Sequence, residues 1–520
     1  MKSINNCYAE KLQIEGKGLN NINMKDKIYN YDKQHLRGKL HALERINYLV
    51  DKDSFHEIGG EVCKYREENH ECLIPYDGVI TGYAYINDKL IYVYAQDFTV
   101  CGGTVGLKHG NKIKKLIQMA IKSKCPIIGI NDSGGARIQE GVNALAGYGN
   151  ILYYNSLASG YIPQISIIAG PCAGGAVYSP GITDFVFMMK GISHMYVTGP
   201  KVIEKVTGQV CDAEELGGSN MHFEESGIAH FISNSEIDCF KSVRKLITML
   251  PSNCHEKMLY QLVYQEKDIK EIKDLLPKET KKVYNICRII EMLADDNSFM
   301  EIQSRFAPNI VIGFAKVCNI TVGFVANQPQ WLGGVLDCDA SIKAARFVRY
   351  CDAYSIPIIT LVDVPGFLPS MQQERNGIIR NGAKLLYSFA EATTIKITII
   401  LRKAYGGAYI AMCSKHLNAD YVYCWPGAEI AVMGAEGALE ILHSKEMKEL
   451  EESKQKLFKE RYIAEYESKY VCADMALKEG YIDGEIEPED TRKIIFDSIC
   501  SLSNSEEMNL LNKKHNTMPL

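Results

Sequence analysis

The chain has 520 residues, a hydrophobic fraction of 46% and a charged fraction of 23%, which is the composition of a globular protein with large buried cores. Its length exceeds that of one ordinary domain, and its formal net charge of -5 provides no basic footprint for a nucleic acid. No apolar run is long enough to span a bilayer, so we expect a cytoplasmic protein without membrane insertion.

Neither the cysteines nor the histidines form a recognisable site in the sequence. The 17 cysteines lie singly in apolar or small-residue contexts, and no two are spaced as Cys-x-x-Cys. The histidines have no partner at metal-ligand spacing. We therefore expect reduced cysteines in the core and no metal in this chain.

The first half of the chain alternates predicted strands with predicted helices, which favours an α/β fold. An amphipathic helix is expected over 35–50, and two strands joined by the turn Asn87-Asp88 follow it. A glycine-rich loop at 101–106 fits neither the dinucleotide fingerprint nor the P-loop pattern. The strands are expected over 78–86, 89–95, 126–130, 164–169 and 185–189, and the next two helices over 109–123 and 141–158.

Two of these strands end in loops that carry candidate binding residues. The strand over 126–130 leads into Asp132 and then Gly134-Gly135-Ala136-Arg137, and the strand over 164–169 leads into Gly174-Gly175-Ala176. A glycine pair between a strand and a helix lets a ligand approach the backbone, and the first helical amides there are unpaired. Such amides suit an oxyanion, but paired glycines also permit close packing, and both interpretations are open at this point.

An internal repeat is the strongest organisational feature of the sequence. The segment Ser54-Phe55-His56-Glu57-Ile58 returns as Ser298-Phe299-Met300-Glu301-Ile302, and the glycine turn at Gly174 returns at Gly406-Gly407-Ala408. A charged segment over 250–283 separates the two copies. We therefore expect a duplicated chain, with one domain over 1–265 and the other over 266–520.

Side chains near the loops have structural interpretations that compete with functional ones. Asp132 and Asp363 each follow a strand, where capping a helix is favoured over acid–base catalysis. Cys172 and Cys413 stand near helix starts, where filling space is favoured over nucleophilic attack. Arg137 can meet a phosphate, although the sequence alone favours a structural role for it.

The segment over 443–469 is rich in Glu and Lys at helical spacing. A solvated pair of surface helices is the favoured interpretation, and a docking surface for a partner is the alternative. No G-x-S-x-G elbow occurs in the chain, so an α/β-hydrolase triad lacks its sequence pattern.

Two oxyanion-type turns in one chain suit a reaction in which negative charge develops on two oxygens. Carboxyl transfer between a thioester enolate and a ureido carbamate is such a reaction, because the thioester oxygen and the urea oxygen each become negative. It needs no side-chain nucleophile, since the decarboxylated urea nitrogen can take the α-proton.

Several long motifs extend over most of the chain, between residues 35 and 492. They are His35 to Leu40, Gln96 to Val100, Asn131 to Gln139, Gly170 to Pro180, Asn327-Gln328-Pro329, Asp363 to Leu368 and Gly377 to Lys384. In these motifs the chain resembles the carboxyltransferase (β) subunit of biotin-dependent acyl-CoA carboxylases, and the similar subunits of methylmalonyl-CoA decarboxylase and transcarboxylase.

The resemblance implies two tandem crotonase-like domains of the ββα superhelix type, with coenzyme A on the first and biotin on the second. It implies that Gly174 and Gly175 hold the thioester oxygen, and that Gly407 and Ala408 hold the biotin ureido oxygen. The other positions that it implies are Gly134, Gly135, Ala136, Arg137 and Ile410 for substrate binding, and Gly366, Phe367, Tyr405 and Gly406 on the biotin side.

The activity implied by the resemblance is carboxyl transfer between carboxybiotin on a partner carrier and a short acyl-CoA, with propionyl-CoA giving methylmalonyl-CoA. The implied partners are biotin carboxylase and biotin carboxyl carrier subunits, or membrane decarboxylase subunits, around a homohexamer built as a trimer of dimers. Acetyl-CoA carboxylation and the decarboxylase or transcarboxylase reactions stay open. A non-catalytic CoA-binding module is the alternative from another class, and the intact glycine turns in both halves speak against it.

The chain departs from the family pattern at two positions. Ser370 stands where glycine is expected after Phe367-Leu368-Pro369. Ile410 follows the second glycine turn where propionyl-CoA carboxylases usually have aspartate, and in the family this position bears on the choice of acyl chain. The chain has no biotinyl-lysine context and no ATP-grasp segment, so biotin and its carboxylation are expected on other polypeptides.

Overall fold

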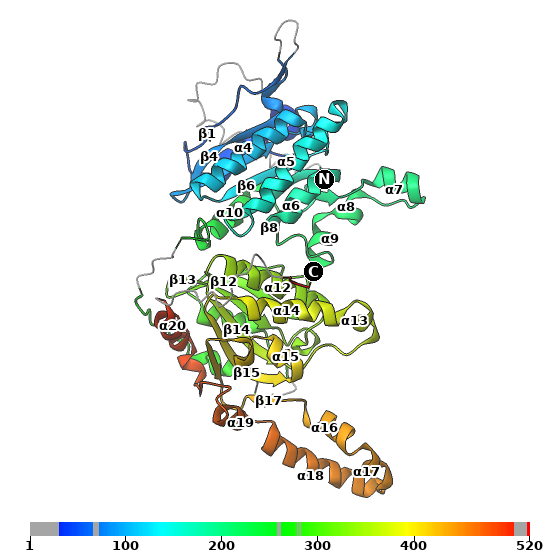
Figure 1. The fold of residues 1–520 in the computed structure, drawn as a ribbon, viewed down its shortest axis with the longest axis vertical. Helices are drawn as coiled ribbons and strands as arrows, with labels where there is room; N and C mark the ends of the chain where they lie inside the picture. Colours follow the sequence, from blue (N-terminus) through cyan, green and yellow to red (C-terminus); the bar gives the residue numbers. More distant parts are fainter. Residues whose placement is uncertain are drawn as a thin grey trace. The chain divides into compact units, whose positions relative to one another are not determined.

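The computed structural model describes residues 31–65, 72–256, 262–277, 279, 282–503 and 517–519 of the chain. Its contacts divide the chain into two compact units, Met1–Cys254 and His255–Leu520. Each unit contains one large sheet with helices packed on it, which confirms the α/β prediction (Figure 1). No described helix combines the length and the apolar character needed to cross a bilayer.

The division between the units falls before the predicted boundary at 265/266. The backbone N–H of Gln265 donates to the Cys318 Sγ at 3.4 Å, within the second unit. Ile269 and Ile272 are buried in the core of that unit. The part of the charged segment from Gln265 to Ile272 is therefore packed onto the second unit and is not a free linker.

The sheet of the first unit is parallel except at one edge. Its strands from β5 onward run parallel to one another, and β1, β4 and β5 are antiparallel neighbours. In order across the sheet they are β1 (His56–Glu57), β4 (Val79–Ile86), β5 (Lys89–Gln96), β6 (Ile127–Ser133), β7 (Gln164–Ala173), β8 (Phe185–Met189) and β10 (Phe231–Ser233), and β9 (His194–Tyr196) pairs with β7.

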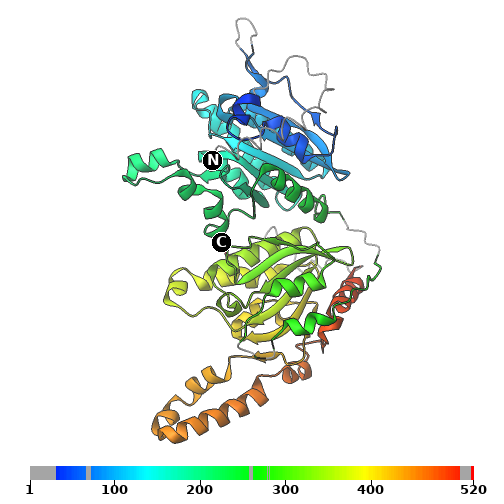
Figure 2. The ribbon, with the colours of Figure 1, turned by 180° about the vertical axis from the view of Figure 1, so that it is seen from behind.

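Helices cover both faces of this sheet. The helices α4 (Leu107–Ser123) and α5 (Val142–Ala158) pack on each other and on one face, while α3 (Ala42–Leu49) and α10 (Glu236–Met249) lie on the other (Figures 1 and 2). The shorter elements are α2 (Tyr31–His35), a ribbon of β2 (Lys64–Tyr65) and β3 (Cys72–Ile74), α6 (Tyr178–Ile182), α7 (Pro200–Thr207), α8 (Ala213–Gly217), α9 (Ser219–Glu224), and the 3-10 turns η2 (Pro75–Gly78), η3 (Cys101–Gly103), η4 (Ile138–Glu140) and η5 (Gly174–Val177).

The second unit repeats this topology strand for strand, which confirms the predicted duplication. Its central strands are again parallel, and at one edge the first strand is antiparallel to the second and the second is antiparallel to the third. In order they are β11 (Met300–Ile302), β12 (Ile310–Val317), β13 (Ile320–Asn327), β14 (Ile358–Val364), β15 (Lys396–Tyr405), β16 (Tyr421–Cys424) and β18 (Gly484–Glu485), and β17 (Glu429–Ala431) pairs with β15.

The helices of the second unit also repeat those of the first. The helices α12 (Cys338–Ala353) and α14 (Ile378–Glu391) pack on each other over one face, and α11 (Ile286–Leu293) and α20 (Thr491–Leu502) form a core with the other (Figure 2). The remaining elements are α13 (Met371–Arg375), α15 (Gly406–Ala411), α16 (Ala435–Leu442), α17 (Ser444–Glu449), α18 (Glu452–Tyr470), α19 (Ala473–Lys478), and the turns η6 (Lys270–Leu275), η7 (Leu332–Gly334), η8 (Lys415–Leu417) and η9 (Pro488–Asp490).

The tight turn predicted at Asn87-Asp88 is confirmed, whereas the long helix predicted from residue 35 is interrupted. Asn87 and Asp88 join β4 to β5 with φ of 48° and 63°, as a two-residue hairpin turn of type I′ requires. Of the helix predicted over 35–50, the structure confirms the part that forms α3, whereas α2 ends at His35 and the chain turns at Gly38 before α3 starts behind His41. His41 and Glu44 form a capping box there, a feature that was not expected from the sequence.

In each unit a buried arginine ties the first helical region to the last helix. Arg45 of α3 donates from Nε to the Glu236 carboxylate of α10 at 2.6 Å. Arg492 of α20 donates from Nη2 to the carboxylate of Asp295, which follows α11, at 2.5 Å. The first unit has the equivalent of the second pair in Arg244 of α10, which donates to the Leu49 carbonyl and to Asp51 as Arg492 donates to the Leu293 carbonyl and to Asp295. The Arg45–Glu236 pair is specific to the first unit, because Ile289 stands in α11 where Arg45 stands in α3.

The Glu- and Lys-rich segment forms helices, as predicted, but one side of α18 is aromatic. Phe458, Tyr462, Tyr466 and Tyr470 follow one another at four-residue spacing, with successive ring centroids 6.4, 5.8 and 5.2 Å apart. α18 packs against α16, and the pair extends away from the sheet of the second unit (Figure 1). A solvated charged surface therefore describes only part of this segment.

We expect Gly103→Ala to lower the thermal unfolding midpoint clearly more than Gly102→Ala. Both glycines have positive φ, 62° and 64°, so both variants are expected to lose about 1–2 kcal/mol to backbone strain. A Cβ on Gly103 would also lie 2.1 Å from the Asp132 carbonyl oxygen, whereas one on Gly102 would meet no atom within 4 Å. Equal midpoints for the two variants would contradict this close approach of η3 to β6.

Candidate functional site

The glycine turn of the first unit lies where β7 passes into η5. Gly174 follows the last strand residue, Ala173, and has a φ of 63°, which turns the chain sharply. The 3-10 turn begins at once, so the amides at its start have no partner within the turn. Gly175 packs beside the ring of Tyr148, 3.4 Å from where a Cβ would stand.

The second unit carries the same construction where β15 passes into α15. Gly406 has a φ of 59°, and it follows Tyr405, the last residue of the strand. Gly407 is exposed, and Ala408 is buried behind it. Ile410, on the same short helix, is 37% exposed and follows the turn directly.

The strand register shows which residues of the two turns are equivalent. Ser133 pairs with Cys172 in the first sheet, and Val364 pairs with Ala404 in the second. Gly174 and Gly175 are therefore equivalent to Gly406 and Gly407. The implied biotin-side pair, Gly407 and Ala408, corresponds to Gly175 and Ala176, one position along from the implied thioester pair.

The loops after β6 and β14 lie beside these turns in both units. Ala136 forms an isolated bridge with Val105, and Phe367 forms the equivalent bridge with Leu336. Gly135 accepts at its carbonyl from the Val105 N–H at 2.9 Å, and Gly366 accepts in the same way from the Leu336 N–H at 3.0 Å. The structure thus brings the two predicted loop sets into matching positions, each next to a glycine turn. Gly134 is exposed beside them.

Arg137 is a predicted site residue whose charged side chain points into the protein. It is 2% exposed, and its Nη1 donates to Asp77 at 2.6 Å and to Glu140 at 3.0 Å. Its Nη2 donates to the Thr104 carbonyl at 2.8 Å. Burial opposes its charge, but the bonds to Asp77 and Glu140 outweigh burial and raise the pKa of Arg137. These contacts give Arg137 the role of holding the loop in place.

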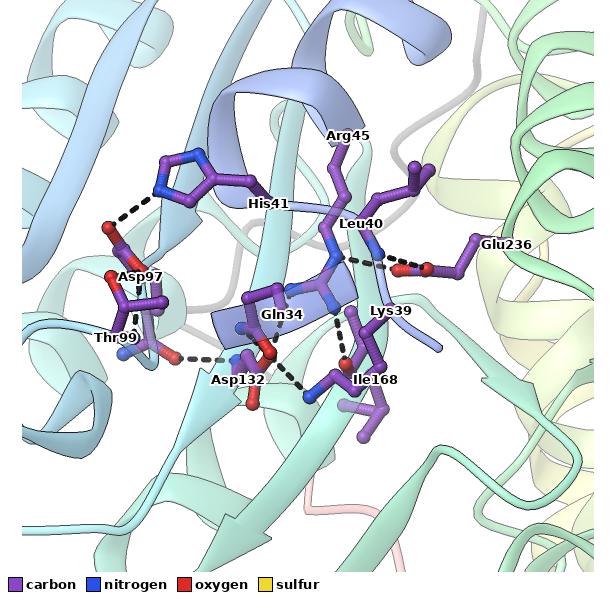
Figure 3. A network of polar contacts seen from close by, with 12 residues as sticks. Gln34, Lys39, Leu40, His41, Arg45, Asp97, Thr99, Asp132, Ile168 and Glu236 are labelled. Atoms are coloured by element: carbon purple, nitrogen blue, oxygen red, sulfur yellow. Dashed lines mark hydrogen bonds and ion pairs between the residues drawn. The ribbon is translucent and has the colours of Figure 1, made fainter. Parts of the chain in front are cut away.

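Asp132, at the end of β6, is the centre of a buried ionic network (Figure 3). Its Oδ2 accepts from Lys39 Nζ at 2.7 Å and from Arg45 Nη1 at 2.9 Å. Arg45 also donates to the Ala169 carbonyl in β7 at 2.8 Å and, as described, to Glu236. The network therefore joins the N-terminal segment, two strands and α10 beneath the first glycine turn.

Asp363, at the end of β14, is paired differently in the second unit. Its Oδ2 accepts from Arg402 at 3.0 Å, and Arg402 belongs to β15 itself. The equivalent position in β7 is Gly170, where a Cβ would lie only 2.0 Å from the Asp132 Oδ1 and 2.5 Å from the Lys39 Nζ. The absence of a side chain at Gly170 thus leaves room for Lys39, a cation from the N-terminal segment, to reach Asp132.

The prediction that these two aspartates cap helices is therefore wrong. Both lie within strands and bind buried cations. Ser370, the residue that replaces an expected glycine, is a helix cap: its Oγ accepts from the Gln373 N–H at the start of α13. The helix cap in this region is thus Ser370, which was noted in the sequence only as a departure from the family pattern, and neither aspartate is a cap.

Cys172 and Cys413 fill space, as predicted. Both thiols are fully buried, and burial is the main cause that raises the pKa of each to about 12. Within the described part of the chain, no three His, Cys, Asp or Glu side chains are grouped as a metal site would need. The two turns have the arrangement of their backbone amides in common.

Residues 33–518 match the family described as Carboxyl transferase domain. The chain belongs to the carboxyl transferase family. A similar protein is the propionyl-CoA carboxylase beta chain of Roseobacter denitrificans, which is 48% identical over 493 residues, covering 94% of this chain and 95% of that protein. Another is the methylmalonyl-CoA decarboxylase subunit alpha of Propionigenium modestum, 45% identical over 526 residues, covering 98% and 99%.

A solved structure agrees with this family membership. Transcarboxylase 12S, described as a hexamer with methylmalonyl-coenzyme A and methylmalonic acid bound, superposes with a TM-score of 0.89 at 41% identity, covering 99% of this chain and 98% of that one. The predicted carboxyltransferase resemblance and the duplicated crotonase-like fold are thereby confirmed.

We expect Cys172 and Cys413 to resist iodoacetamide in the native protein at pH 8. With a pKa of about 12, each thiol is almost entirely protonated at that pH, and the thiolate is the reactive form. Peptide mass spectrometry before and after denaturation measures the labelled fraction. Exposed Cys101 is the control that reacts in both states, and native labelling of Cys172 at the rate of Cys101 would contradict the burial.

Proposed function

We propose that this chain transfers a carboxyl group between carboxybiotin on a partner carrier and a short acyl-CoA, with propionyl-CoA and methylmalonyl-CoA as the acyl pair. The observation that carries the proposal is the exposed Gly407, where a Cβ would meet no atom within 4 Å. Gly407 is also not among the residues with positive φ. A glycine that neither packing nor backbone conformation requires, placed at unpaired amides, suits a ligand that must come close to the backbone.

The choice of acyl pair rests on the relatives. The similar protein of Roseobacter denitrificans is a propionyl-CoA carboxylase beta chain, and the transcarboxylase 12S structure holds methylmalonyl-coenzyme A. Ile410 provides an exposed aliphatic side chain directly after the turn, where it can contact an acyl chain. We assign Ile410, together with the loop from Gly134 to Ala136, to substrate binding.

The chain's own contribution to the reaction is to hold negative charge with preformed amides. We assign the thioester oxygen to the turn of Gly174 and Gly175, with the Ala176 amide added because it is equivalent to that of Ala408. We assign the ureido oxygen to Gly407 and Ala408, and the surrounding biotin-side surface to Gly366, Phe367, Tyr405 and Gly406. When bound, biotin supplies the ureido nitrogen that carries the carboxyl group. Amides fixed at a turn need little reorganisation as charge develops, so their stabilisation favours the transition state.

Biotin must arrive on another polypeptide. We propose biotin carboxylase and biotin carboxyl carrier subunits as partners, around a homohexamer like that described for transcarboxylase 12S. The decarboxylase reaction is the second candidate, because the Propionigenium modestum relative matches along 98% of this chain. Co-purification with membrane decarboxylase subunits, in place of a biotin carboxylase, would select that candidate.

A direct test is to incubate the purified full chain with methylmalonyl-CoA and free biotin, and to follow the loss of methylmalonyl-CoA by chromatography. We expect loss that depends on biotin, with propionyl-CoA as the product. Malonyl-CoA in parallel measures the acyl preference. Absence of biotin-dependent turnover with both thioesters would contradict the proposed function.

We expect Gly407→Val to reduce the turnover at least about a hundredfold, as loss of a preformed oxyanion donor does. A Cβ on Gly407 would meet no protein atom within 4 Å, so a valine side chain fits there without a clash. It should therefore block the ligand without disturbing the fold. The thermal midpoint should therefore stay near that of the wild type. Gly149→Val is the matched control, because Gly149 is also exposed with no atom within 4 Å of its Cβ position. Wild-type turnover in Gly407→Val would show that the turn only packs.

A further inference from the structure

A short parallel strand pair lies directly beside each glycine turn. In the first unit, Pro171 pairs with His194 and Ala173 with Tyr196. In the second unit, Lys403 pairs with Glu429 and Tyr405 with Ala431. The register makes Glu429 the counterpart of His194, and it makes Tyr405 the counterpart of Ala173.

A tyrosine ring fills the same place in both units but comes from opposite strands. A Cβ on Gly199, which precedes α7, would lie 3.4 Å from the ring of Tyr196 on β9. A Cβ on Gly434, which precedes α16, would lie 3.6 Å from the ring of Tyr405 on β15. In the second unit alone, the tyrosine is thus the residue immediately before the glycine turn.

This exchange gives the second turn an anchor that the first one lacks. The Tyr405 hydroxyl donates to the Glu429 carboxylate, and both residues are partly buried. The hydroxyl of Tyr405 is therefore held by Glu429, while its ring lies beside Gly434. At the corresponding place in the first unit, Ala173 offers no hydrogen-bonding side chain, and His194 lies 3.1 Å from Glu214 instead.

The surroundings keep the phenol of Tyr405 protonated, so it remains a donor. Burial is the largest cause that raises the pKa of Tyr405, and the hydrogen bond to Glu429 adds to it. The charges of Glu429, Glu467 of α18 and Asp363 of β14 raise the pKa further. A protonated phenol facing a carboxylate is a strong, charge-assisted hydrogen bond.

We infer that Glu429 is a positioning residue for the carboxyl donor: through Tyr405 it holds the turn from Gly406 to Ala408, and its loss impairs the biotin side of the reaction without affecting the acyl-CoA side. This inference rests on the proposed function. In this role Glu429 acts through its hydrogen bond to Tyr405, the residue that leads into the turn, and not by contact with a substrate. Glu429 lies in β17, outside the turn from Gly406 to Ala408.

The test compares Glu429→Ala, Tyr405→Phe and the double variant in the biotin-dependent loss of methylmalonyl-CoA. We expect each single variant to lower kcat/KM for free biotin at least about tenfold, the size expected for a hydrogen bond to a charged group. KM for methylmalonyl-CoA and its Kd by calorimetry should stay within about twofold of the wild type. The double variant should be no worse than either single variant, because both remove the same bond.

Matched and conservative variants separate positioning from general damage. Glu214→Ala removes the carboxylate beside His194 in the first unit and should leave kcat/KM for biotin unchanged. Glu429→Gln keeps an acceptor and the side-chain volume, so it should recover part of the loss, and it replaces Glu429→Ala if that variant does not fold. Unchanged methylmalonyl-CoA binding confirms that a variant is folded.

Three outcomes would overturn the inference: equal losses on the biotin and CoA sides, additive losses in the double variant, or wild-type kcat/KM for biotin in Glu429→Ala. A large loss in Tyr405→Phe with none in Glu429→Ala would make the phenol act directly on the ligand, which also overturns it. Failure of the proposed function shows itself differently, as absent biotin-dependent turnover in the wild type.

Discussion

Each glycine turn is supported by a buried carboxylate at the end of the neighbouring strand. Asp132 and Asp363 are 0% and 2% exposed. Asp132 binds Arg45, which also donates to the strand leading to the first turn, and Asp363 binds Arg402, which belongs to the strand leading to the second turn. A buried carboxylate that loses its cation strongly destabilises the fold, so separating the strand ends would cost much free energy. The amides of the turn thus project from a fixed edge, as a site built on backbone donors requires.

The glycines of the site divide into those that the fold needs and those that it does not. Gly174 and Gly406 have positive φ and turn the chain, so their role is explained by conformation. Gly170 leaves room for Lys39 and Asp132, so its role is explained by packing. Gly407 has neither explanation. Gly149 inside α5 shares these properties, so the indication of a ligand comes from the place of Gly407 at the unpaired amides where α15 starts.

The sequence predicted what depends on neighbouring residues, and it missed what depends on distant ones. The turn at Asn87-Asp88 and the strand-to-helix glycine turns are local patterns, the repeat can be read by comparing segments of the sequence, and all are found as expected. The partner of Asp132 lies 87 residues away in Arg45, and the partner of Arg137 lies 60 residues away in Asp77. No spacing rule connects such residues, so an aspartate after a strand was interpreted as a cap.

The Arg45–Glu236 pair has a consequence for a chain that contains the same fold twice. Exchanging the closing helices between the two units would separate Glu236 from Arg45 and place it near Ile289, the fully buried residue of α11 that corresponds to Arg45. A buried charge without its counter-charge is costly, whereas the correct pairing satisfies both residues. This pair therefore distinguishes the closing helix of the first half from that of the second, and it protects a duplicated protein from exchanging these helices as it folds.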